Sequence, residues 1–135
     1  MKKMNNKGFS LVELIIVIAI MAILIGVLAP QYIKYVERSR VSADKDILDS
    51  IYTACTTAAA DPEVTDAPAT VGTVSFSSGS SWTAEVYDTL GVSNITDITF
   101  KSKSASSSAL SISVDSNGNF TVTTSGTGGS ITVPE

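Results

Sequence analysis

The fold is decided near the N-terminus, where residues 7–30 read KGFSLVELIIVIAIMAILIGVLAP. From Leu14 to Ala29 every residue is apolar or glycine. The 21 residues from Phe9 to Ala29 would form an α-helix about 31 Å long, which matches the hydrocarbon core of a bilayer. The sequence therefore predicts one membrane-spanning helix that begins close to residue 9.

The charges around this apolar stretch predict its orientation and its processing. Lys2, Lys3 and Lys7 precede it, and the positive-inside rule keeps them in the cytoplasm. An ordinary secretory signal is cleaved after its apolar segment, but no small-residue site follows Ala29. Gly8 offers a small residue before the segment instead. Residues 1–8 are therefore predicted to be a basic leader whose removal keeps the helix in the mature protein.

The order Lys7-Gly8-Phe9-Ser10-Leu11-Val12-Glu13-Leu14, followed by the apolar stretch, resembles the N-terminal signal of type IV prepilins and pseudopilins. The shared features are a short basic leader, a glycine before the cut, an aromatic residue after it and a glutamate four residues further on. The resemblance implies that a membrane-embedded prepilin peptidase cuts between Gly8 and Phe9 and N-methylates Phe9. It also implies export by a pilus assembly platform and its ATPase.

Glu13 is the one charge in the predicted membrane helix. A carboxylate there costs up to about 2.5 to 3.5 kcal/mol on insertion scales. Cleavage after Gly8 would create an ammonium group on Phe9, one helical turn away. When such helices pack side by side, Glu13 can pair with the ammonium group of a neighbouring subunit, because a buried charge is tolerated with such a partner. Glu13 is therefore the predicted assembly residue, and the family resemblance implies the same role.

Gly26 and Pro30 are the weakest helix formers in the apolar stretch. Pro30 lacks an N–H and clashes with the carbonyl group four residues earlier, which belongs to Gly26. The resemblance to pilins implies a segment that can loosen in a filament. A helix hinge at Gly26 and Pro30 and a mild kink without a mechanical role are both compatible with the sequence.

Residues 30–60 predict an amphipathic continuation of the helix that ends before Asp61 and Pro62. Apolar residues recur every three or four positions, interrupted by Arg40. This stripe should pack on a C-terminal head. Five charged residues beside it are expected to stay solvated or to pair between subunits: Glu37, Arg38, Asp44, Lys45 and Asp49.

Residues 61–135 are rich in Ser and Thr and predict a small antiparallel sheet. A loop over residues 63–70 precedes a short edge strand at residues 71–76, and Ser81 is predicted to cap a helix from Trp82 to Leu90. Apolar residues then alternate with polar ones in four further segments, which predict strands around residues 98–100, 110–114, 120–122 and 131–133. The predicted fold class is α+β, with residues 9–29 as the membrane-spanning or filament-core helix, residues 30–60 as its amphipathic continuation, and residues 61–135 as the head.

Asn117 and Gly118 allow two hairpin registers. A two-residue loop would place Val114 opposite a polar residue, whereas a three-residue loop with Gly118 in the left-handed conformation places Val114 opposite Phe120. The second register keeps apolar residues together and is the one we predict.

The composition argues against several functions. The chain has no histidine and a single cysteine, which excludes His-based catalysis and His/Cys metal sites, so no enzymatic activity, metal or cofactor is predicted. Removal of residues 1–8 takes three of the nine basic residues and none of the thirteen acidic ones, which moves the formal charge from −4 to −7. An acidic subunit is poorly suited to direct nucleic-acid binding.

The favoured function is a structural subunit, the major pilin, of an extracellular type IV pilus that serves adhesion, motility or aggregation. The subunit would be a single-pass protein of the cytoplasmic membrane before assembly and part of a homo-oligomeric helical filament afterwards. One alternative is a minor pilin or pseudopilin of a type II secretion or competence (DNA-uptake) machine. Another is a monomeric, membrane-anchored, exported binding module.

Overall fold

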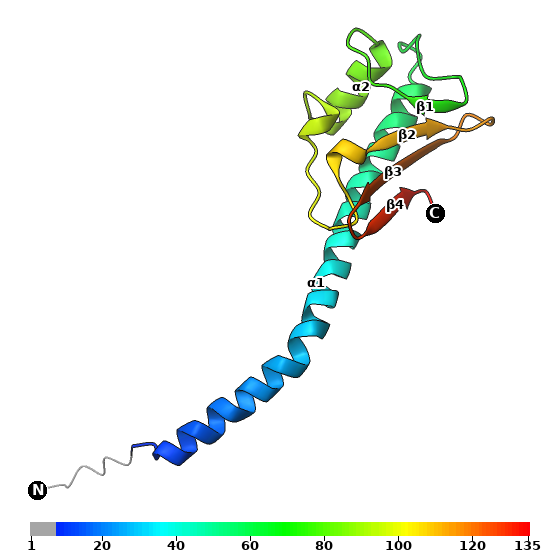
Figure 1. Cartoon of the computed structure of the whole chain (residues 1–135). Helices are drawn as coiled ribbons and strands as arrows, with labels where there is room; N and C mark the ends of the chain where they lie inside the picture. The colour runs from blue at the N-terminus through cyan, green and yellow to red at the C-terminus, as the bar shows by residue number, and fades with distance from the viewer. Residues whose placement is uncertain (1–7) are drawn as a thin grey trace, which may run out of the picture. The chain divides into compact units, whose positions relative to one another are not determined.

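A computed structural model describes residues 8–135 and has an α+β fold, as the sequence predicts (Figure 1). Of the predicted leader, residues 1–7 lie outside the described residues. The elements, in chain order, are the helices and strands α1 (Leu11–Ala60), β1 (Gly72–Val74), α2 (Ser81–Leu90), η1 (Ile95–Asp97), η2 (Ser107–Ala109), β2 (Ser111–Val114), β3 (Phe120–Gly126) and β4 (Gly129–Val133).

The chain divides into two compact units, and the division falls inside α1, between Val36 and Glu37. The described part of the first unit is helical from Leu11 onward. The second unit, residues 37–135, contains the C-terminal half of α1 together with every strand. We call this second unit the head. The head therefore includes part of the long helix, which supplies one wall of its core.

The four strands form one antiparallel sheet in the order β1-β2-β3-β4. Val114 lies opposite Phe120 and Ile112 opposite Val122, so the predicted register is confirmed. Gly118 has a φ of 82°, the left-handed conformation that this turn requires. The alternation of residues therefore places the apolar side chains of β2, β3 and β4 on one face of the sheet.

That apolar face packs on α1 within the head. The buried residues of α1 are mostly small or aliphatic and recur at helical spacing, and the sheet contributes alternate residues of β2, β3 and β4. The core comprises Leu48, Ile51, Ala54, Cys55, Ala58, Trp82, Val86, Ile98, Ile112, Val114, Phe120, Val122, Ile131 and Val133. Burial raises the pKa of the Cys55 thiol to about 12, as expected for a cysteine that serves as a core residue.

Helix α2 is fixed at both ends. The hydroxyl group of Ser80 accepts a hydrogen bond from the Thr83 N–H, so the cap lies one residue before the predicted Ser81, and Gly91 ends the helix in the left-handed conformation. Trp82 is 1% exposed, and its indole N–H donates to the Cys55 carbonyl oxygen at 3.3 Å. Trp82 is therefore a core anchor that ties α2 to α1.

The prediction of a strand around Ile98 and Phe100 is wrong. Residues 98–106 contain no strand, although Ile98 is buried. The backbone N–H groups of Lys101 and Ser102 donate to the carboxylate of Asp44 at 2.9 and 2.7 Å instead of joining a sheet. The segment is thus hydrogen-bonded to a helix side chain rather than to a neighbouring strand.

The expectation that Asp44 stays solvated or pairs between subunits is also wrong. Asp44 is fully buried, and both of its carboxylate oxygens are occupied by backbone N–H groups of its own chain. Glu37, seven residues earlier on α1, accepts from the Lys103 N–H at 2.6 Å, and Lys45 pairs with Glu135. Three of the five charges expected to stay solvated or to pair between subunits therefore make contacts within the head.

Candidate assembly site

Helix α1 begins with a reciprocal cap built from Ser10 and Glu13. The Ser10 N–H donates to Glu13 Oε2 at 3.0 Å, and the Glu13 N–H donates to Ser10 Oγ at 3.2 Å. The Leu14 N–H donates to the Ser10 carbonyl oxygen at 3.2 Å. This is the capping-box arrangement, which satisfies helix N–H groups that would otherwise lack partners. It fixes the Glu13 carboxylate at the first turn of the helix.

Gly8 and Phe9 lie just before this cap and are exposed. Phe9 is 92% exposed, and a Cβ atom added to Gly8 would meet no atom within 4 Å. The peptide bond between the two residues is therefore free of contacts with the described chain.

The apolar stretch of α1 has no partner within the described chain. Its large side chains are about half exposed or more throughout, for example Leu14, Ile18 and Leu28. Among residues 8–135, α1 is the one helix long and apolar enough to cross a membrane. Such a surface requires either lipid or other apolar helices around it.

The structure brings Gly8, Phe9 and Glu13 together at one end of α1, but not Gly26 and Pro30. Gly26 lies thirteen residues beyond Glu13, or about 20 Å along a helix at about 1.5 Å per residue. Pro30 lies inside α1, which continues through both residues. The predicted cleavage and assembly residues therefore form one site, and the predicted hinge is a separate feature of the same helix.

The head offers no cluster suited to a metal ion. Among residues 8–135, no group of three or more His, Cys, Asp or Glu residues is arranged to hold a metal ion. Asp115 accepts hydrogen bonds from the N–H groups of Asn117 and Asn119 and from the Asn119 side chain, and these bonds lower the pKa of its carboxyl group. This arrangement supports the interpretation of that loop as a hairpin turn.

Comparison with known proteins gives matches for the N-terminal part. The family model for the prokaryotic N-terminal methylation motif matches residues 3–29. The matched residues include the predicted cleavage site and most of the apolar stretch. The type IV major pilin protein PilA of Myxococcus xanthus (strain DK1622) is 47% identical over 50 residues, which are 37% of this chain and 23% of that protein. A type IV major fimbrial protein FimA of Dichelobacter nodosus is 52% identical over 40 residues, 30% of this chain and 26% of that protein.

The likeness to known proteins covers a minor part of the chain. The chain spans about a quarter of the length of these curated relatives. No solved structure matches the chain significantly. The match to the methylation motif includes Gly8, Phe9, Glu13 and Gly26 and ends one residue before Pro30.

Ser10, within the matched residues 3–29, was not predicted from the sequence to have a role. Ser10 acts as the helix cap that holds Glu13, and the signal was present as Ser-x-x-Glu directly before an apolar stretch. The cap adds a structural role for Glu13 to the predicted assembly role.

Proposed function

We propose that this chain is a prepilin whose mature form is the major structural subunit of an extracellular type IV filament. In this proposal a prepilin peptidase removes residues 1–8, N-methylates Phe9 and leaves a mature subunit of residues 9–135. The observation that carries the proposal is the exposed apolar surface of α1 next to the Glu13 cap, in a segment similar to those of two major pilins. Filament assembly would cover that surface.

The proposed role of Glu13 is to pair with the new N-terminus of another subunit. Its Oε2 atom is engaged by the Ser10 N–H, whereas Oε1 has no hydrogen-bond partner among residues 8–135. The free oxygen can accept from an incoming ammonium group without breaking the cap. The ion pair would form as the apolar helices pack, because a carboxylate removed from water needs an opposite charge nearby.

The proposed filament requires a change of surroundings for the apolar helix. Before assembly, α1 would cross the cytoplasmic membrane with the head outside, and an assembly platform with its ATPase would extract the subunit. After assembly, the helices would form the filament core. Gly26 and Pro30 are proposed as the hinge, because Pro30 cannot donate a hydrogen bond to the Gly26 carbonyl group.

The first experiment is mass spectrometry of the N-terminal peptide from material sheared off the cells. A methylated Phe9 N-terminus in abundant sheared filaments is the expected result. The same processed end found in membranes alone would favour a minor pilin or a pseudopilin. An intact leader would favour a monomeric anchored module and overturn the proposal.

A matched pair of variants sharpens this test. Gly8→Leu places a bulky side chain at the proposed cut and should leave the leader attached, since the peptidase needs a small residue there. Gly26→Ala alters the other glycine of the segment, where an added Cβ atom meets nothing within 4 Å, and should leave cleavage unchanged. Normal cleavage of Gly8→Leu would place the processing site elsewhere.

A further inference from the structure

The head carries a basic group of side chains at one end. Hydrogen bonds from the Lys101 N–H to Asp44 and from the Lys103 N–H to Glu37 fasten their loop beside the turns of α1 that contain Arg38 and Arg40. All four cationic side chains are exposed. We define the basic end as Arg38, Arg40, Lys101 and Lys103.

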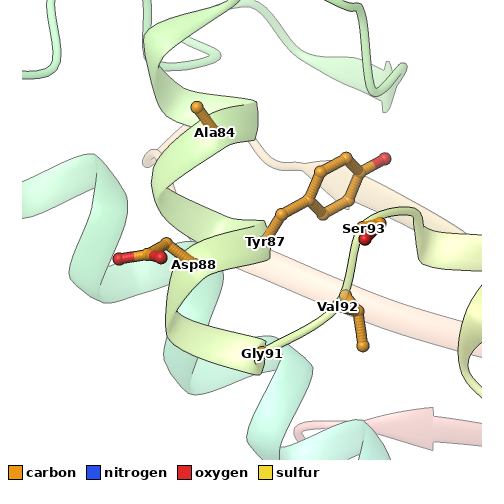
Figure 2. Close-up of a pocket in the computed structure, with 6 residues that line it drawn as sticks. All are labelled: Ala84, Tyr87, Asp88, Gly91, Val92 and Ser93. Carbon is orange, nitrogen blue, oxygen red and sulfur yellow. The ribbon is translucent and has the colours of Figure 1, made fainter.

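An acidic group of side chains lines an open hollow of about 430 Å³ where α1 ends and α2 passes. Asp61, Glu63, Glu85 and Asp88 contribute the four carboxylates, and no basic residue lines the hollow. Figure 2 shows Asp88 projecting from the opposite side of α2 to the Tyr87 ring. We define the acidic hollow by these four carboxylates.

Neither group is neutralised inside the head. Among residues 8–135 there is one ion pair, between Lys45 and Glu135, and it belongs to neither group. The carboxylates nearest the basic end, those of Glu37 and Asp44, are occupied by backbone N–H groups. These two carboxylates keep their charge, but they form no ion pair with the four cations. The defining side chains of each group thus share one sign and have no ionic partner within the head, so an opposite charge is the partner that each fits.

The two groups are too far apart to meet within one chain. Arg40 and Asp61 are separated by 21 residues, Arg40 within α1 and Asp61 at its end. At about 1.5 Å per residue this is a separation of about 31 Å along the helix. A second copy that lies beside the first and is shifted by about this distance along the helix axis would bring its basic end level with the acidic hollow of the first.

We propose that the acidic hollow of one head receives the basic end of another copy of this chain, in a head-to-tail contact repeated along the filament. The proposal rests on the proposed function, which supplies the array of parallel copies. The two surfaces differ, so the contact does not close into a dimer and instead propagates in one direction. Exposed ion pairs are individually weak, so the contact would fix spacing and register while the apolar helices supply adhesion.

Charge reversal in the full-length chain tests the proposal. One variant reverses two of the four charges of the acidic hollow with Glu85→Lys and Asp88→Lys, and a second reverses two of the four charges of the basic end with Arg38→Glu and Arg40→Glu. Each should lower the yield of sheared filaments by about fivefold or more, because the altered group loses its net charge and the substituted side chains repel those of the facing group. The variant with all four changes restores opposite charges and should recover to within about twofold of wild type.

A charge-matched control separates the contact from net charge. Asp46→Lys with Asp49→Lys makes the same change in charge at exposed positions of α1 outside the hollow, and should leave the yield within about twofold of wild type. Normal yields from both single-end variants would mean that the hollow faces solvent or a small cation, and would overturn the proposal. Absence of filaments from the wild-type chain would instead overturn the proposed function.

Disulfide trapping gives an independent measurement that keeps every charge. Ser39 lies between Arg38 and Arg40, and Ala84 lines the acidic hollow. Filaments of the Ser39→Cys, Ala84→Cys double variant should give a ladder of cross-linked oligomers on oxidation, and each single variant should give none. The native Cys55 is fully buried and should not contribute. Filaments of the double variant without a ladder would overturn the proposed contact.

Discussion

Two isoleucines on the same helix have opposite surroundings. Ile18, in the first unit, is 56% exposed, whereas Ile51, in the head, has no exposed surface. Around Ile51 the sheet and α2 supply the covering side chains from the same chain. Around Ile18 residues 8–135 supply little cover, so lipid or another molecule would have to provide it.

The amount of exposed apolar surface indicates which of the two units needs lipid or other subunits to cover it. Fifteen large apolar side chains between Phe9 and Leu28 are exposed. Full burial of an exposed side chain of this size contributes about 1.5–3 kcal/mol. Because most of these side chains are about half exposed, the stretch gains on the order of 10 kcal/mol or more from lipid or neighbouring helices. The head gains its cover on folding. We therefore expect changes in the first unit to alter assembly, and changes in the head core to alter stability.

The largest effect on filament assembly should come from Glu13→Ala. It removes the carboxylate proposed to pair with a neighbouring ammonium group, and filament yield should fall by about tenfold or more, the effect of roughly 1.4 kcal/mol or more per subunit contact. Membrane insertion should proceed normally, since an alanine costs less in lipid than a carboxylate. Sheared filament and membrane fractions are quantified by immunoblot.

The control for Glu13 lies in the same cap. Ser10→Ala removes the hydroxyl group that accepts from the Glu13 N–H and leaves the carboxylate. It should reduce filament yield far less than Glu13→Ala. Equal losses from the two variants would assign Glu13 to capping alone and contradict its proposed assembly role.

The largest effect on the stability of the head should come from Trp82→Ala. Trp82 stacks on Phe76 and Phe120, with ring centroids 5.4 and 5.8 Å apart, and is 1% exposed. Truncation of such a residue costs about 3–5 kcal/mol of unfolding free energy. Urea unfolding of the detergent-solubilised chain, followed by circular dichroism, should show this loss, while insertion of the first unit stays normal.

Much of this fold could be predicted from the sequence because its main signals are local. Alternation in residues 110–133 fixes which face of each strand is buried, and Gly118 fixes the hairpin register. Contacts between distant segments left no comparable signal. Asp44 was predicted to be a surface charge. No periodic pattern indicates that its carboxylate accepts hydrogen bonds from N–H groups 57 and 58 residues later in the chain.

The hydrogen bonds to Asp44 also explain why the strand predicted at residues 98–100 is absent. The pattern of Ile98 and Phe100 correctly predicted that Ile98 is buried. The prediction that this segment pairs with a neighbouring strand was wrong, because the Lys101 N–H donates to Asp44 instead. At the assembly site, Glu13 was found from sequence because a charge in a membrane helix is conspicuous. The role of Ser10 was missed because it depends on the local backbone geometry at the helix start.

An intermediate effect should come from Asp44→Asn. The amide retains one acceptor oxygen and places an NH₂ group near the second N–H, so one of two buried donors loses its partner. The expected loss is about 1–3 kcal/mol of unfolding free energy. Fluorescence of the single tryptophan, Trp82, in a urea titration measures it.

The exposed neighbour Asp46 provides the matched control for Asp44. Asp46→Asn makes the same chemical change on the same helix, at a side chain without a hydrogen bond among residues 8–135. Its urea midpoint should equal that of wild type. An equal midpoint for Asp44→Asn would mean that the loop of residues 101–103 is not held by this carboxylate.

The smallest effect should appear as a pH dependence of head stability. Asp66 accepts hydrogen bonds from the Ser81 hydroxyl group at 2.5 Å, from the Trp82 N–H at 2.9 Å and from the Ser81 N–H at 3.0 Å. These bonds, with that of the Ser81 hydroxyl group first, lower the pKa of Asp66 from 3.8 to about 2. The charged form is thus favoured in the folded state, at the start of α2 where a negative charge also suits the helix dipole.

The sign of the pH dependence follows from that lowered pKa. A carboxyl group with a lower pKa in the folded state contributes its stabilisation above the unfolded value, here 3.8, and loses it as the pH falls towards about 2. Stability measured from pH 5 down to pH 2 should therefore decline across this window, and Asp66→Asn should decline less steeply. Asp115, whose pKa is also lowered, should supply part of the remaining slope. An Asp66→Asn profile parallel to that of wild type would mean that Asp66 does not hold the start of α2.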